Sequence, residues 1–183
     1  MKVVFLDRDG VINKYPGDSA YVTSWKQFHF IPGSIEGIRK LNLKDFKIFV
    51  VSNQAGVAKG LYSQKALNEI DKRMLAEFRK HKVKVDGIYY CTHREEDNCA
   101  CRKPKTGLLA KALEEADISV SSAETFFVGD SFIDMNTAKN FGSKAVLVFS
   151  GKEKISNRSK WAFEPDYLCD NLLMAAHYLC SIV

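Results

Sequence analysis

Short apolar runs alternate with amphipathic segments along the whole chain, and this alternation constrains the fold more than any other feature. Five runs are predicted to be buried strands, at 2–6, 47–52, 87–91, 125–128 and 145–149. Five segments have apolar residues at helical spacing, at 34–43, from Ser63 to about 80, from Thr106 to about 116, at 133–140 and at 170–180. Apolar strands separated by such helices predict an α/β fold, with a mostly parallel sheet covered on both faces.

The length and composition predict one soluble domain, spanning residues 1–183. Hydrophobic residues make up 46% of the chain and charged residues 27%, which excludes disordered, collagen-like and coiled-coil proteins. No apolar run is long enough to cross a membrane, and Asp7 interrupts the first run too early for a signal peptide. We therefore expect a cytoplasmic protein that has no membrane partner and acts as a monomer. A net charge of +5 suits an anionic ligand but is too small to indicate nucleic acid.

Polar residues follow four of the predicted strands at the point where each strand ends. They are found at 7–10 (DRDG), 52–54 (SNQ), 91–93 (CTH) and 129–130 (GD). Any one of these groups could be a polar loop that only satisfies its own backbone. However, the carboxyl ends of parallel strands meet at one edge of a sheet, where such folds bind their ligands. Four polar strand ends therefore predict a single site.

These residues are suited to phosphoryl transfer. Asp7 lies at the end of a strand, where a fixed nucleophile is expected, and Asp9 could protonate the leaving oxygen and then activate water. Asp7, Asp130 and a backbone carbonyl provide hard oxygen ligands for Mg²⁺. That cation and Lys103 would offset the repulsion between a carboxylate and a phosphate. Ser52 and nearby N–H groups would hold the phosphoryl oxygens.

A second group of residues has the composition of a structural zinc site. Cys91, His93, Cys99 and Cys101 provide three thiolates and one imidazole within eleven residues. Free thiols in a loop are the alternative interpretation. The odd number of five cysteines argues against a complete set of disulfides. Because the group ends directly before residues 102 and 103, bound Zn²⁺ would fix a loop that delivers Arg102 and Lys103 to the site.

The four strand-end motifs together resemble those of the haloacid dehalogenase-like phosphatases: DRDG at 7–10, SNQ at 52–54, RKP at 102–104 and GDxxxD at 129–134. The resemblance implies a Rossmann-like three-layer fold and an aspartyl-phosphate intermediate on Asp7. It implies that Asp9 is the acid and base, and that Ser52 and Lys103 bind the phosphoryl group. The implied ligands of Mg²⁺ are Asp7, the Asp9 carbonyl and Asp130, with Asp134 in support.

The zinc-type loop followed by CRKP narrows the resemblance to the heptose 1,7-bisphosphate 7-phosphatases and the related histidinol-phosphate phosphatases. We expect a small phosphorylated sugar as substrate, with removal of its 7-phosphate. The chain has no insertion long enough for a separate cap domain, so loops 13–31, 54–62 and 92–102 should select the substrate. The expected substrate-binding residues are Gly10, Tyr21, Asn53, Gln54, Ala55, Arg102 and Lys103. One departure is Ser131, where many of the heptose enzymes carry lysine.

Three other functions remain open from the sequence. The first is hydrolysis of histidinol phosphate. The second is a nucleic-acid 3′-phosphatase, which an uncapped site would admit, although the chain lacks a broad basic stripe with interleaved aromatic residues. The third is a non-catalytic binding module stabilised by zinc, which would not need the full set of Asp7, Asp9, Lys103 and Asp130.

Overall fold

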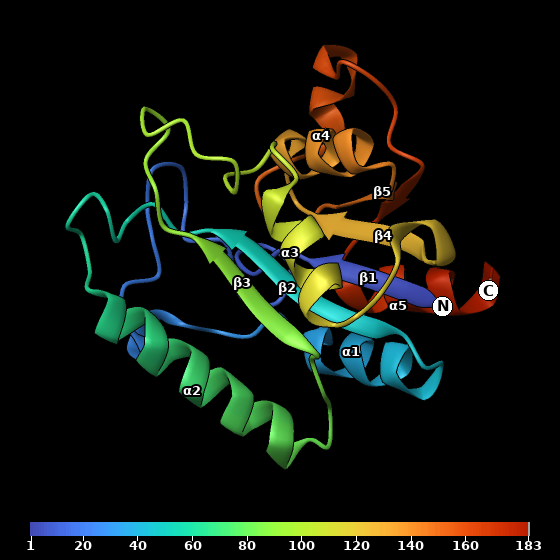
Figure 1. Ribbon diagram of the computed structural model, residues 1–183, viewed down its shortest axis with the longest axis horizontal. Coiled ribbons are helices and arrows are strands. Elements are labelled where there is room, and N and C mark those ends of the chain that lie inside the picture. Colours follow the sequence, from blue (N-terminus) through green and yellow to red (C-terminus); the bar gives the residue numbers. More distant parts are fainter. Residues whose placement is uncertain (183) are drawn as a thin grey trace.

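Six parallel strands form the middle layer of the fold (Figure 1). The computed structural model describes residues 1–182. The strands lie in the order β3-β2-β1-β4-β5-β6, and every neighbouring pair is parallel. Their bounds are β1 Lys2–Leu6, β2 Lys47–Asn53, β3 Gly87–Cys91, β4 Glu124–Gly129, β5 Lys144–Val148 and β6 Tyr167–Cys169. The predicted α/β class with a parallel sheet is confirmed.

Helices cover both faces of this sheet, which gives three layers (Figure 1). One apolar core lies under α1 (Ser34–Leu43), α2 (Gln64–Lys80) and α5 (Leu172–Ile182). The other core lies under α3 (Gly107–Glu115) and α4 (Phe132–Phe141). Three short 3₁₀ helices, at Trp25–Gln27, Val120–Ser122 and Ile155–Lys160, interrupt the loops.

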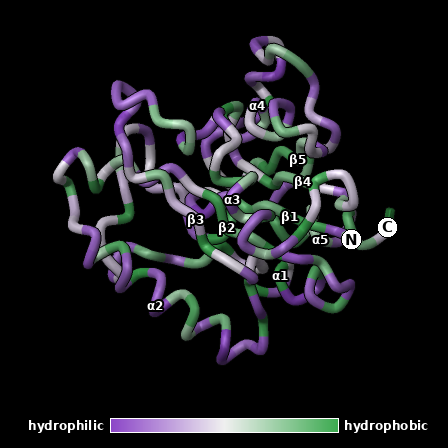
Figure 2. Tube along the Cα trace, viewed as in Figure 1, coloured by the Kyte–Doolittle hydropathy of each residue, from purple (hydrophilic) through white to green (hydrophobic). Residues whose placement is uncertain are grey.

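The burial of each strand follows from its position in the sheet. The central strands β1 and β2 are almost entirely buried, and the tube coloured by hydropathy shows their apolar residues in the interior (Figure 2). The edge strand β3 is half-buried along most of its length. Strand β6 occupies the other edge and pairs only with β5. The sequence pattern missed β6, because its three half-buried residues are too few to give a periodic signal.

Helix ends follow local hydrogen-bonding chemistry. The Ser63 hydroxyl accepts a hydrogen bond from the Ala66 N–H at 3.1 Å, so the predicted N-cap of α2 is observed. Helix α5 starts two residues later than predicted, because the Asn171 side chain accepts from the Met174 N–H at 3.1 Å and caps it. Helix α4 ends at Gly142, whose φ of 80° places it in the left-handed region.

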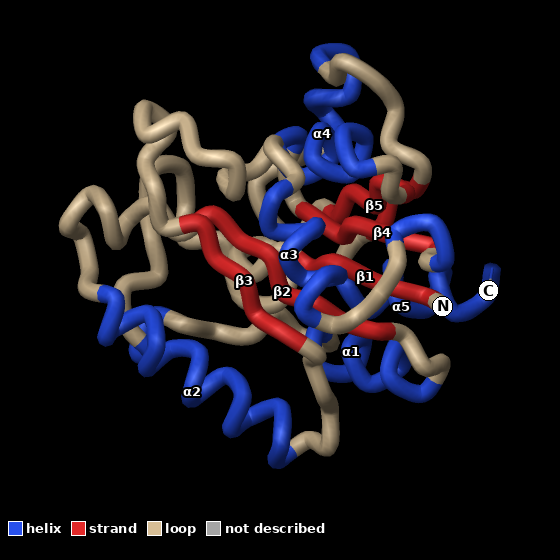
Figure 3. Tube along the Cα trace, in the orientation of Figure 1, coloured by secondary structure: helices blue, strands red, loops and turns tan. Residues whose placement is uncertain are grey.

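Long loops gather where the strands end at their carboxyl termini, on the left in Figure 3. The loop between β1 and α1 is anchored by stacking of Trp25 on Phe28, with ring centroids 5.0 Å apart, and by contact of Phe30 with Phe78 of α2. This edge of the sheet therefore carries an ordered rim. Within residues 1–182, no helix combines the length and hydrophobicity needed to cross a membrane.

Candidate active site

A buried lysine joins two carboxylates at the carboxyl edge of the sheet. The Lys103 ammonium lies 3.1 Å from an oxygen of Asp7, at the end of β1, and 2.5 Å from one of Asp134, in the first turn of α4. It also donates to the carbonyl of Val51 at 3.1 Å. Burial opposes its charge, but the carboxylates of Asp134 and Asp7 outweigh burial and raise the pKa of Lys103. The lysine is therefore held as a fixed positive charge beside Asp7.

A side chain from β2 fixes the backbone of Lys103. The Asn53 side-chain oxygen accepts from the Lys103 N–H at 3.0 Å, and its amide donates to the Lys103 carbonyl at 3.1 Å. Both polar atoms of Asn53 are thus used in positioning Lys103. Its neighbour Ser52 is buried, and its hydroxyl accepts from the Gln54 amide at 3.2 Å.

Three carboxylates meet beside this lysine. Oxygens of Asp7, Asp130 and Asp134 all lie within 4.8 Å of one another, and all three residues are buried. Burial raises the pKa of Asp7 to about 6 against the opposing charge of Lys103. Burial and the neighbouring Asp134 and Asp7 also raise the pKa of Asp130 well above its usual value. One ammonium cannot neutralise three carboxylates, so this oxygen-rich group fits a hard divalent cation.

Asp134 is the least available of the three to a metal ion. One of its oxygens pairs with Lys103, and the other accepts from the Ser131 hydroxyl at 2.6 Å. Asp130, by contrast, has one oxygen that accepts from the Lys152 N–H at 2.7 Å. The contacts of Asp134 therefore agree with a supporting position behind a cation held by Asp7 and Asp130.

The Asp9 carboxylate is held by three side chains. Arg8, which is fully buried, donates to both of its oxygens, with the shortest contact at 2.9 Å. Asn13 donates to one oxygen at 2.8 Å and Gln54 to the other at 2.9 Å. Gln54 is held in turn by the hydroxyl of Tyr62, which donates to its carbonyl at 2.6 Å. Asp9 is therefore rigidly positioned on the wall next to Asp7.

These groups line one cavity of about 210 Å³. It is lined by the polar residues Asp7, Asp9, Ser52, Lys103, Asp130 and Asp134. Its rim consists of loop residues 15–17 and 19–21, together with Asn53, Ser131, Ile133 and Lys152. The ring of Tyr21 is braced by Tyr62, with centroids 6.2 Å apart, and its hydroxyl accepts from Lys59 at 3.1 Å. The structure thus brings together all the residues that the sequence assigned to the chemical step.

Four of the expected substrate-binding residues do not line this cavity. Gln54 and Ala55 are buried, and the Gln54 amide is used in holding Asp9. Gly10 is also buried, and a Cβ there would lie 2.1 Å from an Asp130 oxygen, so this glycine permits close packing. Arg102 lines an adjoining cavity of about 340 Å³, and its guanidinium donates to the His93 carbonyl at 3.5 Å.

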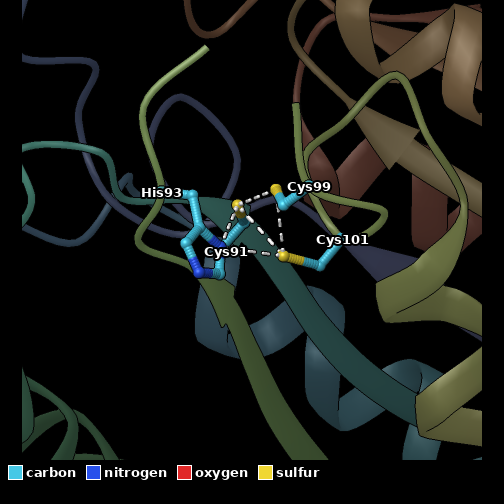
Figure 4. A group of neighbouring side chains, drawn as sticks. All are labelled: Cys91, His93, Cys99 and Cys101. Atoms are coloured by element: carbon cyan, nitrogen blue, oxygen red, sulfur yellow. Dashed lines mark hydrogen bonds between the residues drawn. The ribbon is translucent and has the colours of Figure 1, made fainter. Parts of the chain in front are cut away.

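The four cysteine and histidine residues converge at the end of β3 (Figure 4). The three sulfur atoms lie 3.3–3.5 Å apart, and the Nδ1 atom of His93 lies 3.2 Å from the Cys101 sulfur and 3.7 Å from the Cys91 sulfur. All three thiols are free. Ligand atoms around a tetrahedral Zn²⁺ are separated by about 3.5–3.8 Å. The side chains therefore fit a zinc ion with little movement.

Comparisons with known proteins agree with this geometry. The family described as HAD-hydrolase-like matches residues 100–175. The chain is 37% identical to the D-glycero-alpha-D-manno-heptose-1,7-bisphosphate 7-phosphatase of Campylobacter jejuni, over 84% of this chain and 85% of that protein. It is 38% identical to the D-glycero-beta-D-manno-heptose-1,7-bisphosphate 7-phosphatase of Pasteurella multocida, over 88% of this chain and 89% of that protein. The chain belongs to the heptose bisphosphate phosphatase family of HAD-like hydrolases.

A solved structure of this heptose bisphosphate phosphatase family extends the similarity to the whole fold. The D,D-heptose 1,7-bisphosphate phosphatase of Bordetella bronchiseptica, complexed with magnesium and phosphate, superimposes with a TM-score of 0.90. It is 32% identical and covers 100% of both chains. The similarity confirms the predicted resemblance.

Sequence reasoning did not single out Lys152 of the cavity wall, nor Tyr15 within the expected substrate loop 13–31. Lys152 follows the end of β5 and lines the cavity. Tyr15 lies in the loop after β1 and lines the same cavity. The strand-end rule that selected Asp7 and Asp130 could also have selected Lys152, because residues 150–152 follow a fifth strand of the same sheet.

Proposed function

We propose that the chain is a Mg²⁺-dependent phosphomonoesterase that removes the 7-phosphate of D-glycero-D-manno-heptose 1,7-bisphosphate. The observation that carries this proposal is the buried group of Asp7, Asp130 and Asp134 around Lys103, in one cavity with Asp9. The relatives named for this activity share 32–38% of their residues with the chain over most of its length. Among those relatives, both alpha and beta anomers are named.

The chemistry divides into two displacements. In the first, a carboxylate oxygen of Asp7 attacks the phosphorus, the bond to the sugar oxygen breaks, and Asp9 gives a proton to that leaving oxygen. In the second, Asp9 accepts a proton from water, which attacks the phosphoryl group on Asp7 and releases phosphate. The bonds from Arg8, Asn13 and Gln54 keep the Asp9 side chain within reach of both steps.

Positive charge is needed because a carboxylate attacks a phosphate dianion. Asp7, Asp130 and the Asp9 carbonyl are the proposed ligands of Mg²⁺, which when bound supplies a double positive charge next to the phosphoryl oxygens. Lys103 adds a fixed positive charge at the same place. The Ser52 hydroxyl, at the end of β2, is proposed to donate to a phosphoryl oxygen.

Zn²⁺ is proposed as a structural ion held by Cys91, His93, Cys99 and Cys101, outside the chemical step. The loop that it would clamp leads directly to Lys103. Arg94 of the same loop donates to the Ala58 carbonyl at 2.8 Å. This hydrogen bond connects the loop to the segment between β2 and α2. Bound zinc would therefore stabilise two parts of the rim together.

Arg102 is a proposed contact for a long substrate. Its guanidinium lies in the cavity next to that of Asp7, and Lys103 and Ile133 line both cavities. A sugar that extends past Ile133 would bring a distant phosphate towards it, where a planar guanidinium pairs well with phosphate oxygens.

A phosphate-release assay with Mg²⁺ tests the function. Heptose 1,7-bisphosphate, histidinol phosphate and a 3′-phosphorylated oligonucleotide are compared by kcat/KM, with Asp7→Asn as the inactive control. We expect the bisphosphate to be preferred, and Arg102→Ala to reduce its kcat/KM more than that of histidinol phosphate. A preference for histidinol phosphate would overturn the substrate, and release of no phosphate from any substrate would favour a zinc-stabilised binding module.

A further inference from the structure

The cavity of Asp7 contains a cation that the proposed phosphoryl transfer does not use. Among the described residues that line it, the only basic side chains are Lys103 and Lys152. Lys103 is buried between two carboxylates, whereas Lys152 is half exposed and its ammonium pairs only with Asp18, at 3.4 Å. The Asp18 side chain is 79% exposed, and an ion pair of this kind contributes little free energy. Lys152 is therefore available to a competing anion.

The backbone of Lys152 is fixed against the catalytic groups. Its N–H donates to an Asp130 oxygen at 2.7 Å, and the Ser150 hydroxyl donates to the Gly10 carbonyl at 2.7 Å. A Cβ at Gly151 would lie 1.9 Å from the same Asp130 carboxylate, so glycine permits this close approach. The loop after β5 thus holds the Lys152 backbone next to Asp130, one of the proposed metal ligands.

The charge in the cavity explains why such a cation matters. Four carboxylates line it, of which Asp9 is paired with Arg8, and a transferred phosphate adds two negative charges. One Mg²⁺ and Lys103 do not neutralise the remaining three carboxylates and the phosphate. A substrate with a second phosphate would be repelled unless another cation received that group. Ser131 lines the same cavity but is uncharged, and its hydroxyl is used by Asp134. Lys152 is the described lining residue that has the required free charge.

We propose that Lys152 is a specificity-determining residue that binds the second phosphate of the substrate, the one that is not transferred, in addition to the contact proposed for Arg102 in the adjoining cavity. In the free protein Asp18 holds the ammonium at the rim, and the arriving phosphate replaces Asp18. The Tyr15 hydroxyl donates to Asp18 at 2.7 Å, so the Asp18 carboxylate retains a hydrogen-bond partner when the phosphate has taken its place at Lys152. This inference rests on the proposed function, because it requires a bisphosphate as substrate.

The test compares heptose 1,7-bisphosphate with heptose 7-phosphate in the Mg²⁺-loaded protein. Lys152→Met should raise KM for the bisphosphate about tenfold, the value of one charged contact, and leave kcat within about twofold. The KM for the monophosphate should change by less than about twofold. Asp18→Asn should act in the opposite direction and lower KM for the bisphosphate, because it removes the competing anion. Lys154→Met is the matched control, since Lys154 lies on the same loop outside the cavity lining and should change neither substrate.

The outcomes separate this inference from the proposed function. If the wild-type protein shows no preference for the bisphosphate, both are overturned. If the preference is present and survives Lys152→Met, or is lost only in Arg102→Ala, the role of Lys152 alone is overturned. An equal loss with both substrates would place Lys152 at the transferred phosphate and would also overturn the inference. Binding measured by calorimetry in the Asp9→Asn protein should show the same tenfold change without turnover.

Discussion

The ammonium of Lys103 lies 2.5 Å from a carboxylate oxygen of Asp134, in the interior between the end of the zinc-type loop and the first turn of α4. The two residues are 31 positions apart in the chain. Buried ion pairs are costly to break, because the remaining partner is left as an unpaired charge. This contact therefore locks the loop of residues 92–102 to the helix that follows Asp130, and it links the proposed zinc site to the carboxylates.

Replacement of the nucleophile should abolish turnover without unfolding the protein. Asp7→Asn keeps the shape of the side chain but removes the attacking carboxylate, so phosphate release should fall by about 10³-fold or more. Asp9→Asn should bind substrate and stall, since an amide cannot transfer the proton. Phosphate release with Mg²⁺ measures both effects, and circular dichroism verifies the fold. Near wild-type release from Asp7→Asn would exclude the covalent mechanism.

The same variant should change stability in a pH-dependent way in Mg²⁺-free buffer. The pKa of Asp7 is raised by burial from 3.8 to about 6, so the folded state binds more protons than the unfolded state between these values. Ionisation of Asp7 therefore lowers the free energy of unfolding as pH rises. The loss reaches about 3 kcal/mol once the pH exceeds the folded-state pKa of Asp7. Asp7→Asn should be more stable than wild type at pH 7.5.

The advantage of Asp7→Asn should be smaller at pH 5, by about 1 kcal/mol, because wild-type Asp7 is then largely protonated in the folded state. Urea unfolding of both proteins at the two pH values measures the difference. Addition of Mg²⁺ at pH 7.5 should stabilise the wild type far more than the variant, since ligand binding to the folded state adds stability. A gap that is independent of pH would contradict the raised pKa.

The protein should contain about one tightly bound Zn²⁺ per chain when it is purified without added metal. Elemental analysis measures this content. Cys99→Ser should lose the ion, loosen residues 91–103 and lower kcat/KM by about tenfold or more through displacement of Lys103. Cys180→Ser is the matched control, because Cys180 lies on α5 away from the cluster and should retain zinc. Absence of zinc, or a disulfide between Cys99 and Cys101, would refute the site.

Gly10→Ala should damage the site through a steric clash with Asp130. Gly10 has φ of 88°, and a Cβ there would lie 2.1 Å from an Asp130 oxygen. The matched control is Gly142→Ala, because Gly142 has φ of 80° but a Cβ there would meet no atom within 4 Å. Both variants should lose about 1 kcal/mol from backbone strain. Only Gly10→Ala should also lose Mg²⁺-dependent activity, and equal activity in the two variants would contradict this explanation.

Several features could be predicted from the sequence because they depend on local patterns. The apolar runs of β1, β2 and β4 specify buried parallel strands, and the side chains that follow them must meet at one edge of the sheet. This rule was sufficient to assemble Asp7, Ser52 and Asp130. The zinc-type residues are close together in the chain, so their spacing alone indicated a common site.

Other features depend on the direction in which each side chain points, and only the tertiary structure decided them. Asn53 ends β2 and Gln54 follows it, yet Gln54 is buried and holds Asp9 while both polar atoms of Asn53 hold the backbone of Lys103. Arg102 and Lys103 are neighbours in the chain, yet Lys103 is buried between Asp7 and Asp134 while Arg102 lines the adjoining cavity. Such orientations arise from contacts between residues far apart in the chain, which leave no periodic trace in the sequence.

The sequence by itself determined the parallel α/β sheet and the chemical groups at its carboxyl edge. The tertiary structure decided which charges remain free after those groups pair with one another. Lys103 is buried between Asp7 and Asp134, whereas Lys152 faces the cavity with only an exposed partner. The physical reason is that the charge available to a ligand depends on distance and burial, which are set by packing of the whole fold rather than by the identity of any one residue.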